Sequence, residues 1–255
     1  MRHRDGGWRW FLSRDVPYRR GADGRVAQLL GIATDITTRR LAEQRLAVQH
    51  GVASVLATAT SLDDAAPQIL ASVGGATGWR TGGLWAVDRA RGVLACVDTW
   101  HHPRFPPAFA LASRAYTFAR GQGLPGRVWE SGVAAWVDDV QGDANFPRAE
   151  AARAAGLGAA FAFPVHAGSE VVAVLDFFAT DAREPDQSVL TLLETVALQI
   201  GQFADRRARE AEADDRSARL ALLARIGQQL VLRDTSDRSV LESVFGELAQ
   251  ALDFE

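Results

Sequence analysis

The sequence contains no lysine: all 28 of its basic residues are arginine, which we attribute to a bias in coding composition rather than to chemistry. It has one cysteine, Cys96, so no internal disulfide can form and nothing indicates a disulfide-stapled secreted scaffold. No run of about 18 apolar residues occurs, so we expect no membrane span. Residues 1–6 lack the apolar core of a signal peptide, and we therefore expect a cytoplasmic location.

The composition is that of a globular protein. Its 255 residues are 47% hydrophobic and 23% charged, and nine prolines and 23 glycines are too few for a low-complexity chain. The net charge of −3 offers no attraction for a polyanion. Residues 1–50 hold ten arginines and five acidic residues, but these arginines are scattered rather than clustered with aromatics. We therefore expect no nucleic-acid partner.

The first 37 residues predict a β-hairpin. An aromatic-rich strand over residues 8–12 and a mostly apolar strand over residues 26–34 flank the turn sequence Gly21-Ala22-Asp23-Gly24. Pro17 cannot donate to a strand ladder and marks an edge or a bulge. An isolated hairpin is at best marginally stable, so we expect that a preceding part of a domain is missing.

The pattern then changes to a helical period. Apolar residues recur at helical spacing over 38–60, at Leu41, Val48, Val52, Val55 and Ala59. We expect a hydroxyl of Thr37 or Thr38 to cap this helix. A second helix is predicted over residues 62–77, with Ser61 as its N-cap and Gly78 as its stop.

The rest of the chain alternates strands and helices. Strands are predicted over 83–87, 93–100, 134–137, 159–166 and 171–179, and helices over 125–131, 147–155 and 187–203. Residues 101–123 are predicted to be a loop with short helical pieces. The helix predicted over residues 187–203 carries an apolar stripe along one face. Residues 204–219 hold five arginines and five acidic residues, so the segment 204–232 is predicted to be a charged helical connector.

A weak internal repeat follows the connector. When the sequence is shifted by 175, Val48 meets Leu223 and Trp79 meets Phe254, and the apolar positions between them agree. The alternative is that any two amphipathic helices align in this way. A real repeat means that the chain stops as a second copy begins.

The two ends of the hairpin carry a first resemblance. The run Arg4-Asp5-Gly6-Gly7-Trp8-Arg9-Trp10 and the later run Gly31-Ile32-Ala33-Thr34-Asp35-Ile36-Thr37-Thr38-Arg39-Arg40 resemble the C-terminal hairpin of a PAS domain and its exit into a signalling helix. The resemblance implies that residues 1–37 end a PAS domain and that residues 38–60 form the signalling helix.

Residues 46–205 resemble a GAF domain. The resemblance rests on residues 121–129 (Gly-Gln-Gly-Leu-Pro-Gly-Arg-Val-Trp), 143–148 (Asp-Ala-Asn-Phe-Pro-Arg), 155–157 and 160–165, with residues 171–178 as the closing strand. It implies an α+β fold in which an antiparallel sheet has helices on one face and a small-molecule pocket on the other. Residues 220–255 resemble the start of a second, truncated GAF domain.

The family context implies bacterial signal transduction. PAS–GAF–GAF chains usually end in a histidine kinase, less often in a cyclic-dinucleotide enzyme such as a diguanylate cyclase or in a phosphatase. We therefore expect a non-enzymatic sensor of a small molecule or redox state, in a two-component system. We expect helices 38–60 and 204–232 to pair in a homodimeric coiled coil, and a response regulator to be a partner only through the missing kinase domain. The alternatives are a GAF-fold redox enzyme and a ligand-free dimerisation scaffold.

Six residues are candidates for a ligand pocket: Trp100, Trp129, Cys96, His101, Phe161 and Phe163. The aromatic ones could instead be core. Cys96 is either a buried small hydrophobic residue or a reactive thiol. Bilin-binding relatives attach their chromophore through a cysteine that is commonly followed by histidine, whereas Val97 follows Cys96 in this sequence. His101, His102 or His166 could be an axial haem ligand, so haem and bilin are the two cofactors considered.

The remaining motifs give no catalytic set. Gly121-x-Gly123-x-x-Gly126 matches a dinucleotide fingerprint but lacks the surrounding βαβ unit, which favours a tight turn feeding a helix. Residues 145–150 lack the lysine of the cyclic-nucleotide GAF signature. The sequence has no H-E-x-x-H, C-x-x-C, P-loop or G-x-S-x-G motif, and we predict no metal site.

Overall fold

The computed structural model describes residues 9–181 and 187–232. The elements are, in chain order, β1 (Phe11–Arg20), β2 (Val26–Asp35), α1 (Thr37–Thr58), α2 (Leu62–Thr77), β3 (Thr81–Asp88), β4 (Val93–His101), α3 (Ala108–Ser113), β5 (Thr117–Phe118), α4 (Gly123–Ser131), β6 (Ala135–Val137), α5 (Ala149–Ala154), β7 (Ala159–Ala167), β8 (Glu170–Ala179) and α6 (Gln187–Leu232). A search of the described helices finds none that is both long and apolar enough to cross a bilayer.

Strands β1 and β2 form the predicted hairpin, but β1 runs over Phe11–Arg20 and not over residues 8–12. They pair antiparallel, with Phe11 opposite Asp35, and the register shifts after Pro17, which confirms the bulge. Gly24 has a φ of 76°, as the predicted turn requires. The apolar side chains of the hairpin are exposed to solvent, Leu29 by 65% and Ile32 by 70%.

Helix α1 begins where the sequence predicts, but the predicted hydroxyl cap is wrong. Ile36 is the N-cap residue and provides no side-chain hydrogen bond. The Thr37 hydroxyl instead accepts a hydrogen bond from the backbone amide of Trp10 at 2.8 Å, and the Thr37 amide donates to Asp35 Oδ1 at 2.9 Å. The hydroxyl is therefore used to close the end of the hairpin, a tertiary contact that local pattern cannot show.

Helix α2 confirms its prediction at both ends. Ser61 Oγ accepts a hydrogen bond from the amide of Asp64 at 3.1 Å, and Gly78 ends the helix in the left-handed conformation with a φ of 73°. Because Ser61 satisfies one of the free amides of the first turn and Gly78 adopts a φ that a side chain disfavours, both boundaries are encoded locally.

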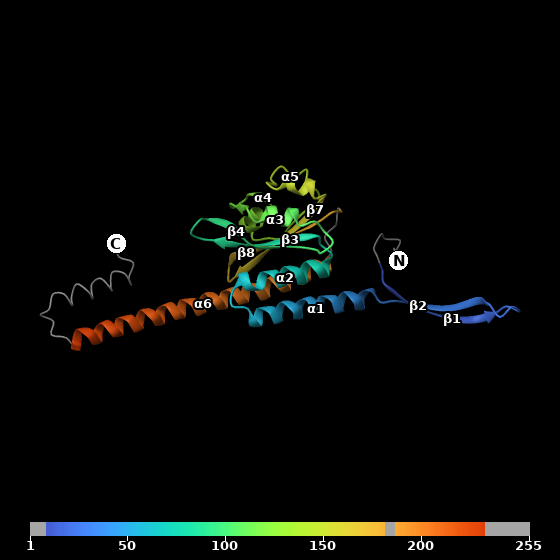
Figure 1. Cartoon of the computed structure of the whole chain (residues 1–255), viewed down its shortest axis with the longest axis horizontal. Coiled ribbons are helices and arrows are strands. Elements are labelled where there is room, and N and C mark those ends of the chain that lie inside the picture. The colour runs from blue at the N-terminus through green and yellow to red at the C-terminus, as the bar shows by residue number, and fades with distance from the viewer. Residues whose placement is uncertain (1–8, 182–186, 233–255) are drawn as a thin grey trace. The chain divides into compact units, whose positions relative to one another are not determined.

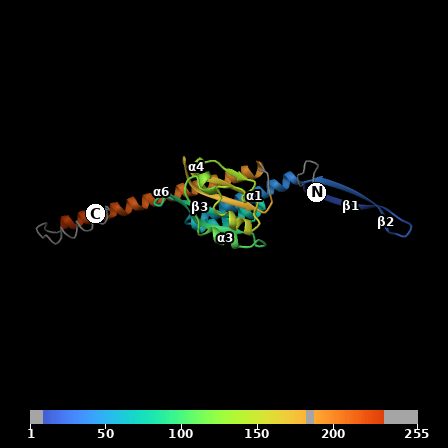
Figure 2. The same ribbon diagram turned by 90° about the horizontal axis from the view of Figure 1, so that it is seen from above.

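The central sheet has six strands in the order β5-β4-β3-β8-β7-β6, and every neighbouring pair is antiparallel. Helices α1 and α2 and the first part of α6 lie on one side, which we call the helical face, and α3, α4 and α5 lie on the other, which we call the distal face (Figure 1). Figure 2 shows the same domain from above, with the helices and the sheet overlapping. The predicted α+β class is confirmed, and the short strand β5 forms within the segment expected to be a loop.

Each face of the sheet buries its own apolar core. On the helical face, the close approach of α2 to β4 depends on Gly74, where a Cβ atom would come 2.2 Å from the Trp100 ring. On the distal face, one continuous cluster fills the space under the short helices, and it contains Trp85, Leu94, Phe109, Phe118, Leu124, Val128, Trp129, Val140, Phe146, Ala152, Leu157, Ala160, Ala162, Val174 and Phe178. The face expected to hold a pocket is therefore packed with side chains.

Helix α6 joins two segments that the sequence predicts separately. No glycine or proline occurs over residues 202–226, so nothing interrupts the backbone between the predicted helix and the charged connector. Val196 and Ile200 are buried, whereas the later charged residues form ion pairs along the helix, including Arg209–Asp205 at 2.6 Å and Arg219–Asp215 at 3.0 Å. The predicted start of a second GAF domain falls largely on residues 233–255, outside the described residues, as do the first eight residues of the predicted PAS end.

Candidate functional site

A single acidic residue interrupts the apolar strand β8. Because side chains alternate along a strand, Asp176 shares the distal face with Val174 and Phe178, while Leu175 and Phe177 point to the helical face. Asp176 is fully buried. A carboxylate removed from water in this way requires a cation or hydrogen-bond donors beside it.

The cation is Arg148, which is also fully buried. Arg148 Nη2 donates to Asp176 Oδ2 at 2.5 Å, and the two side chains are 1% and 0% exposed. Trp85 Nε1 donates to the other carboxylate oxygen at 3.0 Å, and Arg148 Nη1 donates to Ser113 Oγ at 3.1 Å. Within the described residues, the buried Nε of Arg148 has no hydrogen-bond partner.

Aromatic rings enclose the guanidinium group. Its central carbon lies between 5.0 and 5.5 Å from the centroids of five rings, those of Trp85, Phe109, Phe118, Phe146 and Phe178. This is within the range of cation–π attraction, which strengthens when the cation is desolvated. We call Arg148, Asp176, Ser113 and these five rings the arginine cage.

The sheet leaves room for the cage at Gly83. A Cβ atom at this position would lie 3.1 Å from Asp176 Oδ1 and 3.1 Å from Trp85 Nε1. The hydrogen bond between those two groups therefore fits against the bare glycine backbone of the neighbouring strand β3.

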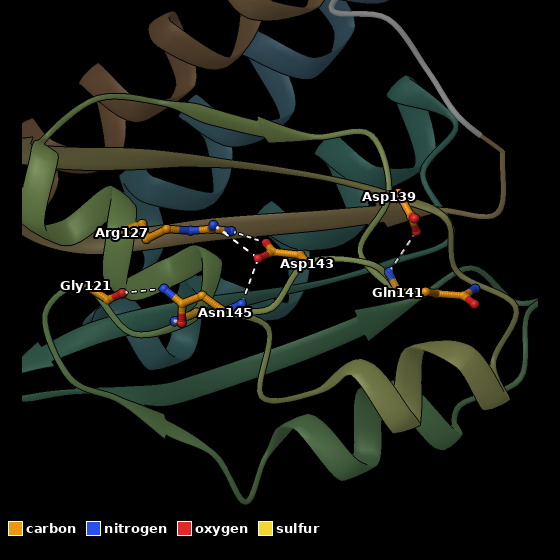
Figure 3. Close-up of polar contacts among 7 residues, drawn as sticks. Gly121, Arg127, Asp139, Gln141, Asp143 and Asn145 are labelled. Carbon is orange, nitrogen blue, oxygen red and sulfur yellow. Dashed lines mark hydrogen bonds and ion pairs between the residues drawn. The ribbon is translucent and has the colours of Figure 1, made fainter.

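The segment before Arg148 is fastened to the start of α4 (Figure 3). Arg127 Nη2 forms an ion pair with Asp143 Oδ2 at 2.5 Å. Asn145 Nδ2 donates to the carbonyl of Gly121 at 2.8 Å, and Asn145 Oδ1 accepts from the amide of Gly123 at 2.8 Å. Gly121 and Gly123 both have positive φ, so the glycine motif is a tight turn whose backbone groups bind Asn145.

The other end of the same segment is held by a second set of bonds. Asp139 Oδ1 accepts from the amide of Gln141 at 3.0 Å, a contact also drawn in Figure 3. Gln141 Nε2 in turn donates to the carbonyl of Leu157 at 2.8 Å. Residues 139–145 thus form a polar latch at the surface, and Arg148 follows it as the residue that precedes helix α5.

Two of the six predicted pocket residues lie on the distal face. Trp129 is buried in the distal core, and the guanidinium of Arg120 lies 4.5 Å from the centroid of its ring. Cys96 packs against the same cluster and is half-buried. Trp129 also lines a polar surface cavity of about 820 Å³ with Glu130 and His166.

The other four lie elsewhere. Phe161 and Phe163 are buried on the helical face, where they line an apolar cavity of about 410 Å³ beside α6. Trp100 packs on Gly74 of α2. His101 ends β4, with Nδ1 3.2 Å from the carbonyl oxygen of His102. The structure does not bring the six residues together, and their role in ligand binding stays a prediction.

Sequence analysis did not select Arg148 or Asp176 as site residues. A signal existed for both: Asp176 is the only charged residue in the run 171–179, and Arg148 closes one of the motifs on which the GAF resemblance rests. A lone acid in an apolar strand indicates a buried charge that needs a partner. Its partner, 28 residues away, is identified only by the tertiary structure.

The environment of Cys96 disfavours thiol chemistry. Burial first, and the nearby Asp176 carboxylate second, together raise the pKa of the Cys96 thiol to about 11. A thiol with this pKa is protonated at neutral pH and is a weak nucleophile. Because side chains and Arg148 fill the face that Cys96 adjoins, the residues there do not fit a bilin attached to Cys96. Across residues 9–181 and 187–232, no three His, Cys, Asp or Glu side chains gather as metal ligands would.

The six-stranded antiparallel sheet, with α1, α2 and the first part of α6 on one face and short helices on the other, defines the α+β architecture of the domain. The family model for the GAF domain matches residues 59–204, more than half of the chain, and the chain belongs to the GAF domain family.

Solved structures agree with this fold. A GAF domain from A. aeolicus, described as in an inactive state, is 16% identical with a TM-score of 0.53, over 66% of this chain and 99% of that one. The GAF domain of a phosphoenolpyruvate-protein phosphotransferase from Coxiella burnetii is 15% identical with a TM-score of 0.56, over 67% and 98%. A free methionine-R-sulfoxide reductase from Neisseria meningitidis is 19% identical with a TM-score of 0.54, over 68% and 93%. No curated protein matches the chain.

Proposed function

We propose that this chain is a sensory and relay segment of a bacterial signal-transduction protein, in which the GAF domain passes its state to helix α6. The observation that carries the proposal is the connection between the two faces of the sheet. Strand β8 presents Asp176 to the arginine cage and Leu175 and Phe177 to the helical face. A change in the cage therefore acts on the strand against which the helices pack.

Helix α6 lies directly against the sheet. A Cβ atom at Gly201 would come 2.0 Å from the carbonyl oxygen of His166 in β7, so the helix backbone contacts the strand backbone there. The helix then continues unbroken to Leu232. Because a continuous helix is stiff over its length, a shift or rotation of its first turns is transmitted along it.

The finer context is part of the same proposal. We infer that α1 follows a PAS domain, that α1 and α6 pair with the same helices of a second copy, and that the output of the whole protein is a histidine kinase. The support is the PAS-like exit sequence before α1, together with the exposed apolar residues of the two helices, Leu41, Leu46, Leu220 and Leu223.

The test is to fuse this chain in frame to a histidine-kinase core and to insert one to seven residues after Ser217. If α6 relays by rotation, autophosphorylation rises and falls with insertion length at the helical period of about 3.6 residues. Matched insertions in the exposed β3–β4 turn, between Ala90 and Arg91, leave the helix phase unchanged and should have no periodic effect. Activity that is independent of insertion length in α6 would contradict the relay.

A thiol reductase is the second candidate, because a methionine sulfoxide reductase has a similar fold. The raised pKa of Cys96, the only cysteine of the chain, argues against it. Assay of free methionine sulfoxide reduction with dithiothreitol decides between the two. We expect no turnover, and turnover that is lost in Cys96→Ser would replace the regulatory proposal with an enzymatic one.

A further inference from the structure

The arginine cage has the chemistry of a receptor for a guanidinium ion. A buried carboxylate supplies the charge, a serine hydroxyl accepts a further hydrogen bond, and five rings surround the planar cation. We propose that this cage binds a small guanidinium compound, and that the side chain of Arg148 is an internal ligand which that compound displaces. The inference rests on the proposed function only in taking the distal face as the input side of the domain.

Most of the side chains that form the receptor come from elements other than the loop that carries Arg148. Trp85, Asp176 and Phe178 belong to the central strands β3 and β8, while Phe109 and Ser113 belong to α3 and Phe118 to β5. Only Phe146 and Arg148 come from the loop before α5. When that loop withdraws, the carboxylate, the hydroxyl and four of the five rings keep their places in the sheet and its short helices.

Arg148 is an incompletely satisfied occupant. A guanidinium has five N–H donors in a fixed fork. The Nη groups of Arg148 bond to Asp176 and Ser113, but its Nε is buried without a partner among the described residues. A buried donor without a partner opposes burial of the side chain. A free guanidinium compound is not tied to the backbone of the loop and can orient its donors independently.

The loop that carries Arg148 can be released at the surface. Ala144, Asn145 and Pro147 are exposed, although the Arg148 side chain is buried. The two hydrogen bonds of Asn145 to the glycine turn hold this loop without touching the cage. The fraction of molecules with the loop open sets the apparent affinity for any compound that must displace Arg148.

The first experiment removes the internal ligand. In Arg148→Ala, ethylguanidinium replaces the deleted atoms, and its binding is measured by thermal shift and calorimetry against ethylurea, its neutral counterpart. With a dissociation constant on the order of 1 mM, about 10 mM ethylguanidinium raises Tm by about 3 °C. We expect no comparable response to ethylurea, and loss of the response in Arg148→Ala/Asp176→Asn. An equal response to ethylurea, an unchanged response in the double variant, or no saturable binding overturns the recognition chemistry.

The second experiment tests displacement in a protein that keeps Arg148. Asn145→Ala removes both side-chain hydrogen bonds between the loop and the glycine turn, so the loop opens more often. The apparent affinity for ethylguanidinium should therefore be on the order of tenfold or more above that of the unaltered chain. Asn145→Ala/Asp176→Asn is the matched control and should not bind. If neither the unaltered chain nor Asn145→Ala binds ethylguanidinium at tens of millimolar, the Arg148 side chain is not displaced from the cage and the proposal fails. This arm also decides the question if Arg148→Ala does not fold.

The outcomes of these binding experiments can be told apart from those of the insertion experiment that tests the relay. The binding measurements use the chain alone and need no output domain. Periodic kinase activity with no guanidinium binding supports the relay and contradicts the cage as a receptor. Guanidinium binding without periodic kinase activity supports the receptor and contradicts the relay.

Discussion

The buried pair of Arg148 and Asp176 shows how one charge requires another inside an apolar core. An ionised group removed from water is tolerated when its partner and its hydrogen bonds are in place, and removing one partner leaves the other uncompensated. Here the five aromatic rings attract the cation, whereas the carboxylate receives from them only the hydrogen bond of Trp85 Nε1.

Asp176→Asn should therefore destabilise the domain by about 3–5 kcal/mol, because it leaves Arg148 buried without its countercharge. Urea unfolding followed by tryptophan fluorescence measures the change. The matched variant Arg148→Met/Asp176→Leu removes both charges, and its free energy of unfolding should fall by less than that of Asp176→Asn. A loss below about 1 kcal/mol in Asp176→Asn would mean that the pair is not buried as described.

The second residue with a testable ionisation is Cys96. Its pKa of about 11 implies that the thiolate is about 100-fold rarer below pH 8 than in a cysteine with an ordinary pKa near 9. Alkylation by iodoacetamide should be slower by about that factor in the folded protein than in urea, and its rate should rise tenfold per pH unit up to about pH 11. A rate that levels off near pH 9 would contradict the shift.

The same shift has a consequence for stability. The folded state keeps the Cys96 proton up to about pH 11, whereas the unfolded chain loses it near pH 9. This contribution to stability is therefore complete below about pH 9 and is lost as the pH rises to 11. Cys96→Ala should remove that part of the alkaline dependence.

At the scale of elements, glycine decides how closely helix α2 approaches the sheet. Gly74 faces the Trp100 ring, whereas the adjacent Gly75 has no atom within 4 Å of the place where a Cβ would stand. The two residues are neighbours in one helix, so they share its propensity and differ only in what they face.

Gly74→Ala should destabilise the domain by about 1–3 kcal/mol, because the added methyl group meets a packed ring. Gly75→Ala should stabilise it by about 0.5–1 kcal/mol through helix propensity alone. Thermal unfolding of the two variants beside the unaltered chain gives the comparison. A stabilising Gly74→Ala would show that α2 does not pack on Trp100.

At the scale of the whole molecule, we expect the chain to dimerise through its long helices. Leu220 and Leu223 are 60% and 46% exposed on α6 and are spaced to lie on one side of the helix. Exposed leucines at this spacing in a charged helix are typical of a coiled-coil seam.

Sedimentation velocity should show a dimer of the unaltered chain. Leu223→Arg should raise the dissociation constant at least about tenfold, because it places a charge in the seam. Ala221→Arg, which lies away from the leucines on the same turn, should have little effect. A strict monomer at tens of micromolar would count against dimerisation and against the relay that depends on it.

The sequence by itself determined most of the elements and the family. Ser61, Gly78 and the Asp23-Gly24 turn encode their boundaries through local hydrogen bonds and positive φ, so a window of a few residues suffices to predict them. Hydrophobic period separated strands from helices, and the α+β class followed from their order.

Tertiary structure alone decided how the distal face is used. Whether the Thr37 hydroxyl caps a helix or closes a hairpin depends on Trp10, which is 27 residues away. The predicted aromatic pocket divides between the two faces because strand bulges and pairing register set which way each ring points. The arginine cage joins four elements and the loop before α5 around one ion pair, and only the folded chain brings those side chains within reach of one another.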